Sequence, residues 1–221
     1  MDLATKRKWD NAVRGYDLMN GYGPEWRWAP SKRRLFAAME GKVLFLAIGT
    51  GQDIQFFPPD RDIIAIDISD QMIAQARRKA ERYQGRLELR PLDVHDLDYP
   101  DATFDQVFTS CTFCSVPDPV NGLRNLRRVL KPGGRFLCLE FSRLVLPGLT
   151  ALYDAYSFRV LPALGEVVTG NREAYLYLAE SIRRFPDQQD FAAMIAAAGL
   201  DRVRVRNLSG GIAALHSAWR L

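Results

Sequence analysis

The sequence predicts an α/β fold organised around one open, mostly parallel β-sheet. A short apolar run at residues 43–47 has the pattern of a buried strand, and it stops at a turn that contains Gly49 and Gly51. A second apolar run at 63–66 ends at Asp67, 16 residues after Gly51. In open parallel sheets, ligands bind in the crevice at the carboxyl ends of the strands. These residues therefore predict both the fold class and the position of a ligand site.

The size and composition of the chain fit one globular domain. The length of 221 residues is enough for a single α/β core, and we expect one domain over residues 1–221. No apolar run approaches the roughly 18 residues that a membrane-spanning helix needs. The basic residues near the start are not followed by the apolar core of a signal peptide. We therefore expect a cytoplasmic location, with peripheral contact at the inner membrane surface left open.

Three cysteines, Cys111, Cys114 and Cys138, are too few for a disulfide framework. The C-x-x-C spacing of Cys111 and Cys114 is compatible with a redox pair or with half of a zinc site. A zinc site would need a second Cys or His pair, whereas the two histidines, His95 and His216, stand alone. We interpret all three cysteines as reduced thiols and expect no metal.

The net charge of the chain is concentrated at the start of the N-terminal segment, residues 1–40. Its first 36 residues hold eight Lys and Arg and four Asp and Glu. The difference is +4, which is the formal net charge of the whole chain. We expect this segment to be helical, with Trp9, Tyr16 and Trp26 among its basic residues. Basic and aromatic residues together are typical of a helix that lies on an anionic membrane surface. A helical lid over the ligand site is the alternative, and the two are compatible.

After Asp67 the chain alternates between predicted helices and strands, which is the pattern of a parallel sheet. The expected elements are a helix at 69–83, strands at 87–94 and 104–110, and a helix at 118–130. Ser69 is expected to cap the first of these helices, and Asp93 lies near the end of the third strand. The Lys131-Pro-Gly-Gly sequence is expected to end the second helix and to turn the chain into a fifth strand.

Residues 143–185 differ in composition from the rest and are expected to form a helical cap insert. The stretch 144–164 is rich in Leu, Val, Tyr and Phe. A cap over an apolar substrate and a simple insert into the core are both compatible with that composition. A further helix is expected at 175–183.

The last part of the chain is expected to complete a seven-stranded sheet. A helix at 187–198 is closed by Gly199. Residues 202–219 then have the pattern of an antiparallel hairpin that turns at Gly210 and Gly211.

The order of these motifs over residues 42–142 resembles the class I S-adenosylmethionine-dependent methyltransferases. The resemblance implies a Rossmann-like class I methyltransferase fold, S-adenosylmethionine as the cofactor and S-adenosylhomocysteine as the product. It also implies that the glycine turn wraps the methionine part, that Asp67 holds the ribose hydroxyls, and that Asp93 and Val94 face the adenine. The residues expected to bind the cofactor are Tyr16, Ala47, Gly49, Thr50, Gly51, Asp67, Ile68, Met72, Asp93, Val94 and Ser110.

Stretches beyond this core are similar to the ubiquinone/menaquinone biosynthesis C-methyltransferase family. The similar stretches are 16–20, 130–142, 153–162, 177–188 and 207–216. The resemblance implies methylation of a ring carbon on a quinol or quinone precursor. Two features depart from the family pattern. The acids that flank the family's glycine turn are replaced by Phe45 and Gln52, and the Arg-Asn pair after the fourth strand is replaced by Cys114 and Ser115. Loss of that Arg removes a fixed positive charge that could stabilise a phenolate.

The bacterial phospholipid N-methyltransferases give an alternative acceptor, phosphatidylethanolamine at the membrane surface. Their Val-Pro-Asp-Pro sequence after the fourth strand is similar to residues 116–119. An amine needs less activation than a ring carbon, so alignment with the methyl group provides most of its acceleration. A non-catalytic S-adenosylmethionine-binding protein is a third possibility, although the cofactor residues are present. The sequence lacks an Asn-Pro-Pro-Tyr-type motif, and we expect no nucleic-acid partner.

For either acceptor, Tyr16 is the expected catalytic residue, and it would act by orienting the acceptor. The residues expected to contact a lipid-like substrate are Cys114, Ser115, Tyr153 and Tyr156. His95 is expected at the surface or behind the site, and His216 within the last strand. The sequence identifies no general base.

Overall fold

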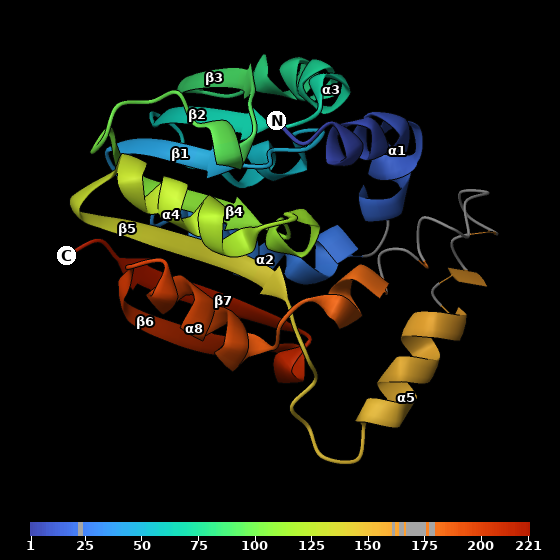
Figure 1. Ribbon diagram of the computed structural model, residues 1–221. Helices are drawn as coiled ribbons and strands as arrows, with labels where there is room; N and C mark the ends of the chain where they lie inside the picture. The colour runs from blue at the N-terminus through green and yellow to red at the C-terminus, as the bar shows by residue number, and fades with distance from the viewer. Residues whose placement is uncertain (22–23, 161, 164–165, 167–175, 177–179) are drawn as a thin grey trace.

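The computed structural model describes residues 1–21, 24–160, 162–163, 166, 176 and 180–221 of the chain. Its centre is a seven-stranded sheet with the strand order β3-β2-β1-β4-β5-β7-β6 (Figure 1). The strands are β1 (Lys42–Leu46), β2 (Asp62–Asp67), β3 (Arg86–Pro91), β4 (Phe104–Ser110), β5 (Leu130–Phe141), β6 (Asp201–Leu208) and β7 (Ala213–Trp219). Strands β1 to β5 pair in parallel, whereas β7 is antiparallel to both β5 and β6. The predicted mostly parallel sheet with a C-terminal antiparallel hairpin is confirmed.

In the described segments, two helices precede the first strand and the others connect successive strands. The α-helices are α1 (Leu3–Gly21), α2 (Pro24–Phe36), α3 (Asp70–Ala80), α4 (Pro119–Val129), α5 (Thr150–Ala155) and α8 (Gln188–Ala197). The short helical turns are η1 (Gln52–Phe56), η2 (Val94–Asp96), η3 (Phe113–Ser115), η4 (Tyr156–Val160) and η5 (Ser209–Gly211). The predicted cap of α3 is confirmed, because the Met72 amide donates to Ser69 Oγ at 3.1 Å.

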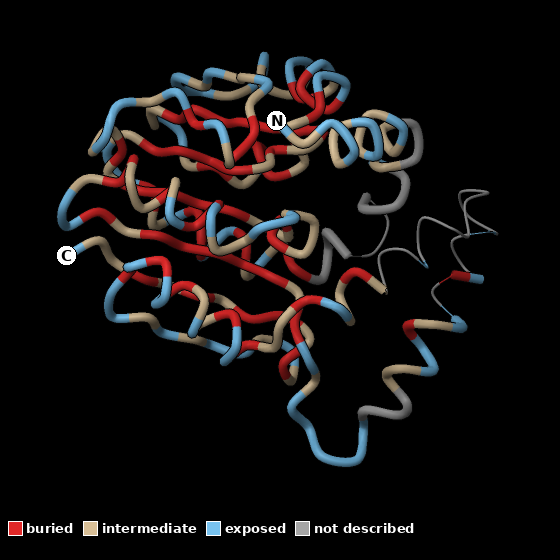
Figure 2. Tube along the Cα trace, viewed as in Figure 1, coloured by how far each residue is buried: buried red, intermediate tan, exposed pale blue. Residues whose placement is uncertain are grey.

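Both faces of the sheet are covered, which explains why β1 is continuously apolar after Lys42 rather than apolar at alternate positions. Successive side chains of a strand point to opposite faces. Leu44 and Leu46 pack into the cluster that contains α4 and α8, and Val43 and Phe45 pack into the cluster that contains α2 and part of α3. The buried residues follow the strands in Figure 2. A strand buried on both sides is expected to be a continuous apolar run.

Two of the expected elements differ from the structure. Lys131-Pro-Gly-Gly is not a turn before β5 but part of it, and the pairing of β4 with β5 is irregular there. The backbone amide of Gly133 donates to Arg220 O and that of Arg220 donates to Gly134 O, so the chain end holds this stretch in the sheet. The insert over 143–185, expected to be helical, is not helical before Thr150, and a π-helical turn follows α5 at Tyr156–Val160. Of the helix expected at 175–183, the described residues 176 and 180–183 are helical.

A buried ion pair attaches α2 to the turn that follows β1. Lys32 Nζ lies 2.7 Å from Asp53 Oδ1, and both residues are less than 9% exposed. Lys32 is on α2, and Asp53 is on η1, directly after the glycine turn. The pair therefore fixes the N-terminal helical segment to the ligand-binding edge of the sheet.

Breaking this ion pair on one side should destabilise the fold strongly. In Lys32→Met the Asp53 carboxylate stays buried without its partner, so the free energy of unfolding should fall by about 3–5 kcal/mol. The double variant Lys32→Met/Asp53→Leu should recover most of that loss. Urea unfolding followed by circular dichroism measures both values.

A matched control is Arg86→Ala, which removes an exposed ion pair with Asp62 at 3.7 Å. Its cost should stay below about 1 kcal/mol. Equal destabilisation of the single and double Lys32 variants would show that the ion pair is not what holds α2 in place.

Candidate functional site

A pocket with about 710 Å³ of empty space lies at the carboxyl ends of β1, β2 and β4. Leu46, Asp67 and Ser110 mark the three strand ends in its wall. All the residues predicted to bind the cofactor line this pocket except Thr50 and Gly51. Its position matches the crevice that the strand and glycine pattern indicates.

Asp67 ties the first two strands together at the pocket. Its Oδ2 accepts a hydrogen bond from the Gly49 amide at 2.8 Å, and its Oδ1 accepts one from the Ser69 amide at 2.9 Å. Burial raises the pKa of this carboxyl to about 6, against the lowering effect of the two amides. A carboxylate has about four acceptor positions, so two remain for a ligand in the pocket.

The glycine turn brings bare backbone to the same place. Gly49 and Gly51 have φ of +55° and +82°, which favour glycine. A Cβ on Gly51 would lie 2.9 Å from Ile54 Cδ1 and 3.1 Å from the Ala76 Cα, so this glycine allows the turn to pack against α3. Thr50 is buried in the turn, below the pocket, and its hydroxyl donates to Asp17. Thr50 and Gly51 thus shape the turn, and Gly49 faces the pocket.

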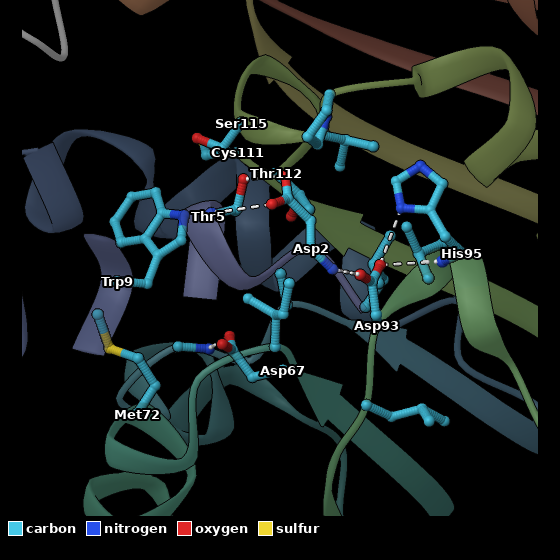
Figure 3. Close-up of a pocket in the computed structure, with 18 of the residues that line it drawn as sticks. Asp2, Thr5, Trp9, Asp67, Met72, Asp93, His95, Cys111, Thr112 and Ser115 are labelled. Atoms are coloured by element: carbon cyan, nitrogen blue, oxygen red, sulfur yellow. Dashed lines mark hydrogen bonds and ion pairs between the residues drawn. The ribbon is translucent and has the colours of Figure 1, made fainter. Parts of the chain in front are cut away.

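Asp93 organises a second polar end of the pocket. Its carboxylate accepts hydrogen bonds from the amides of Asp2 at 2.8 Å and His95 at 3.0 Å, and lies 2.9 Å from His95 Nδ1 (Figure 3). Burial alone would raise the pKa of Asp93, but these hydrogen bonds outweigh it and the pKa lies below its ordinary value. His95 therefore lines the pocket and holds Asp93, rather than lying at the surface.

Helix α1 forms one wall of the pocket. Trp9 and Tyr16 both line it, and their rings meet edge to face with centroids 6.0 Å apart. A Cβ on Gly49 would lie 3.7 Å from the Tyr16 ring and 3.8 Å from its hydroxyl oxygen, so this side chain covers the glycine turn. The wall also includes Asp2 and Thr5, which no sequence motif indicated.

Polar contacts hold α1 against α3 and the glycine turn. Lys6 Nζ lies 2.6 Å from Asp70 Oδ2 and Lys79 Nζ lies 2.8 Å from Asp17 Oδ2. Lys79 Nζ also donates to Thr50 O at 2.9 Å. Some of the N-terminal basic residues therefore form ion pairs within the protein: Lys6 pairs with α3, and Lys32 pairs with η1.

The segment after β4 forms the opposite wall. Ser110, Cys111, Thr112 and Ser115 line the pocket there. Cys114 points instead into a separate pocket with Ser181 and Phe185. Burial raises the pKa of Cys114 to about 12 and that of Cys111 well above its ordinary value, so both stay neutral thiols.

Two further residues expected at the substrate do not reach this pocket. Tyr153 and Tyr156 belong to α5 and η4, and neither lines it. Tyr156 is 45% exposed. In Figure 1 α5 extends away from the sheet. His216 lies in β7 as expected, and it is buried with Nε2 3.0 Å from Gln188 O.

The pocket residues fit S-adenosylmethionine. Asp67 offers two unused acceptor positions at the end of β2, where ribose hydroxyls can donate. Ser110 Oγ is buried with no hydrogen-bond partner among the described residues, so it is available to a ligand. Gly49 presents backbone without a side chain in the way. The residues expected to hold the ribose and the methionine end are thus in one cavity.

Comparisons with known proteins identify the family of this chain. The model of the ubiE/COQ5 methyltransferase family matches residues 6–220. The ubiquinone/menaquinone biosynthesis C-methyltransferase UbiE of Methylobacterium nodulans is 42% identical over 227 residues, covering 96% of this chain and 88% of that protein. The protein of the same name from Dinoroseobacter shibae is 41% identical over 222 residues, with the same coverage.

Solved structures share the fold at low identity. A possible histamine N-methyltransferase from Thermotoga maritima superposes with a TM-score of 0.68 at 17% identity, covering 98% of this chain and 100% of that chain. Haemonchus contortus phosphoethanolamine N-methyltransferase 2, in complex with S-adenosyl-L-methionine, gives a TM-score of 0.63 at 14% identity, covering 96% of this chain and 57% of that chain. The family match spans almost the whole sequence, and most of the residues expected to bind the cofactor line one pocket. This chain is an S-adenosylmethionine-dependent methyltransferase and belongs to the ubiE/COQ5 methyltransferase family.

Proposed function

We propose that this enzyme methylates a ring carbon of a quinol precursor of ubiquinone or menaquinone. The relatives that carry this activity in their names are about as long as this chain and are 41–42% identical to it. The observation that carries the proposal is that a member of this family has a pocket lined by nine of the eleven residues expected to bind the cofactor, all except Thr50 and Gly51. The phospholipid alternative has no comparable support, because the likeness to the phosphoethanolamine enzyme reflects the fold alone.

Bound S-adenosylmethionine supplies an electrophilic methyl group, and the protein must present a nucleophilic ring carbon to it. A quinol carbon becomes nucleophilic when the neighbouring hydroxyl loses its proton or is polarised. The nearby thiols of Cys111 and Cys114 are poor bases, since both remain protonated. The ring nitrogens of His95 are engaged, one with Asp93 and one 3.0 Å from Asp118 O. Catalysis is therefore assigned to the alignment of the ring carbon with the methyl group, and a hydrogen bond from Tyr16 would orient the acceptor.

Contact with an anionic membrane surface is a further part of this proposal. Within the described segments, no helix is long and apolar enough to cross a bilayer. Val145, Leu146 and Leu149 are 45–51% exposed just before α5, where they could enter a lipid surface. The cations Arg7, Lys8, Arg33 and Arg34 are also exposed. Trp9 and Tyr16 face the pocket instead, so the aromatic residues of α1 contribute little to this contact.

Cofactor binding should depend on pH through Asp67. The ionised carboxylate accepts the ribose hydroxyls, and its pKa of about 6 places the change in an accessible range. If binding needs the ionised form, the Kd for S-adenosylhomocysteine should rise about tenfold between pH 7 and pH 5. Titration calorimetry measures this. Asp67→Ala should weaken binding by about 1.5–3 kcal/mol at pH 7.5 and lose the pH dependence. An unchanged slope in that variant would assign the titration to another group.

Tyr16 should matter more for the chemical step than for cofactor binding. With a reduced quinol that lacks the ring methyl, Tyr16→Phe should lower kcat about tenfold, equivalent to about 1.4 kcal/mol in the barrier. The Kd for S-adenosylhomocysteine should stay within about twofold, since the lost hydroxyl acts on the acceptor. Transfer of labelled methyl from S-adenosylmethionine measures the rate.

The matched control is Tyr83→Phe, which removes a hydroxyl that donates to Pro58 O at 2.7 Å outside the pocket. It should leave kcat unchanged. Phosphatidylethanolamine vesicles provide the second acceptor in the same assay. Labelling of the phospholipid without labelling of the quinol would overturn the proposed acceptor.

Charge reversal should separate membrane binding from folding. Arg7→Glu/Lys8→Glu should reduce binding to anionic vesicles about tenfold or more, since each basic residue near a membrane contributes about 1 kcal/mol. Cosedimentation with anionic and neutral vesicles measures it. The matched control is Arg77→Glu/Arg78→Glu, which changes the same charge at two exposed positions on α3. Equal loss in both double variants, or equal binding of the wild type to both vesicle types, would contradict the membrane proposal.

A further inference from the structure

We propose that Glu140 is a positioning residue that holds the acceptor end of the pocket in shape through two backbone amides. The inference rests on the proposed function only in naming the ligand of that end as the methyl acceptor. The segment it holds, residues 111–115, is called the acceptor loop below. Cys111, Thr112 and Ser115 of this loop line the pocket.

The contact that carries the inference joins β5 to the acceptor loop. Glu140 is fully buried near the end of β5. Its Oε1 accepts hydrogen bonds from two successive amides, that of Phe113 at 2.7 Å and that of Thr112. One oxygen atom thus sets the direction of two peptide units directly behind the pocket wall.

The loop needs such a restraint because its backbone is unusual there. Cys111 has a φ of +53°, a conformation that is unfavourable for a residue with a side chain. Its amide donates to Leu139 O at 2.7 Å, next to Glu140 in β5. The chain therefore leaves β4 with a sharp change of direction, and the next two amides lose any strand partner. Glu140 supplies the acceptor that these two amides would otherwise lack.

The far side of the loop is fixed by packing. The ring of Phe113 is buried, and its centroid lies 6.2 Å from that of Phe136 and 5.3 Å from that of Phe191. Ser181 Oγ donates to Cys114 O at 3.0 Å. The loop is thus anchored in the core at Phe113, while Thr112 and Ser115 face the ligand. The Glu140 contact lies between these two parts, so it fixes the position of the pocket wall relative to the core.

Packing in the core does not by itself explain a carboxyl group at this position. The other β5 side chains near it, Leu137, Cys138 and Leu139, are buried and bear no charge. Burial raises the pKa of Glu140 to about 7, and the amides of Phe113 and Thr112 oppose that rise. A buried carboxyl group therefore costs stability that an apolar residue would not. What it adds is a hydrogen-bond acceptor placed at the loop.

The inference can be tested with three substitutions that separate reach from charge. Gln keeps an oxygen at the same distance from the backbone, Asp keeps the charge but withdraws it by one methylene, and Leu keeps neither. If Glu140 acts by its reach, Glu140→Gln should retain kcat/KM for the quinol within about threefold, whereas Glu140→Asp and Glu140→Leu should lose about tenfold or more. The Kd for S-adenosylhomocysteine should change less than about twofold in all three, because Asp67 and Gly49 are not part of this contact.

Hydrogen exchange of the loop gives a readout that does not depend on catalysis. The Thr112 and Phe113 amides should be protected in the wild type and in Glu140→Gln, and should exchange faster in Glu140→Asp. The matched control is Gln188→Leu, which removes buried hydrogen bonds to Arg143 O and Asn207 Oδ1 outside the pocket. It should lower the Tm without changing acceptor kinetics or the exchange of these two amides.

The outcomes distinguish this inference from the proposed function. If the wild type transfers no methyl to the quinol, the proposed acceptor is wrong, and the exchange pattern still decides the role of Glu140. Retained activity and protection in Glu140→Asp, with loss of both in Glu140→Gln, would overturn the inference, because charge rather than reach would then matter. A parallel loss of cofactor affinity would also overturn it. Should Glu140→Leu fail to fold, the Gln and Asp variants alone give the decisive order.

Discussion

The arrangement of the site depends on one buried carboxylate, that of Asp67. It accepts one amide from the turn after β1 and one from the start of the segment before α3. Gly49, 18 residues before Asp67 in the chain, is therefore held at the end of β2. The carboxylate is costly to bury, as its raised pKa shows, and the two amides offset part of that cost. If Asp67 binds the ribose as expected, the carboxylate that shapes the glycine turn also contributes to cofactor affinity.

Glu140 has the equivalent arrangement on the other side of the pocket. It too is a buried carboxyl group near the end of a strand, and it too accepts two backbone amides from a loop that bears pocket residues. Asp67 faces the ligand directly, whereas Glu140 lies behind the wall formed by Thr112. The pocket is therefore bounded by two loops, and a buried carboxyl group accepts two backbone amides at each of them.

The third wall is held differently. Helix α1 contacts α3 and the glycine turn through the Lys6–Asp70 and Lys79–Asp17 ion pairs, and Asp70 and Asp17 are about half exposed. Partly exposed ion pairs are weak and are screened by salt, so this wall is the one most easily displaced. Such a wall suits a site that must admit a bulky acceptor, which is compatible with the lid role expected for the N-terminal segment. The basic residues of the N-terminal segment thereby divide between internal pairs and the exposed positions available to a membrane.

The sequence by itself determined the sheet, its hairpin and the cofactor end of the pocket, because these depend on local patterns. Apolar strand runs, a glycine turn and an acid at a strand end are each visible within a few residues, and the resemblance to a methyltransferase family joined them. Only the tertiary structure decided what the isolated polar residues do. Glu140 looks like an ordinary strand residue until β5 is placed beside the loop after β4. Trp9 was likewise assigned to the pocket only by the placement of α1 beside the ends of β1, β2 and β4. Cys114 and Ser115 are adjacent in the chain and their side chains touch, with Sγ 3.8 Å from Oγ, yet they line different cavities, because the η3 turn places them between the two.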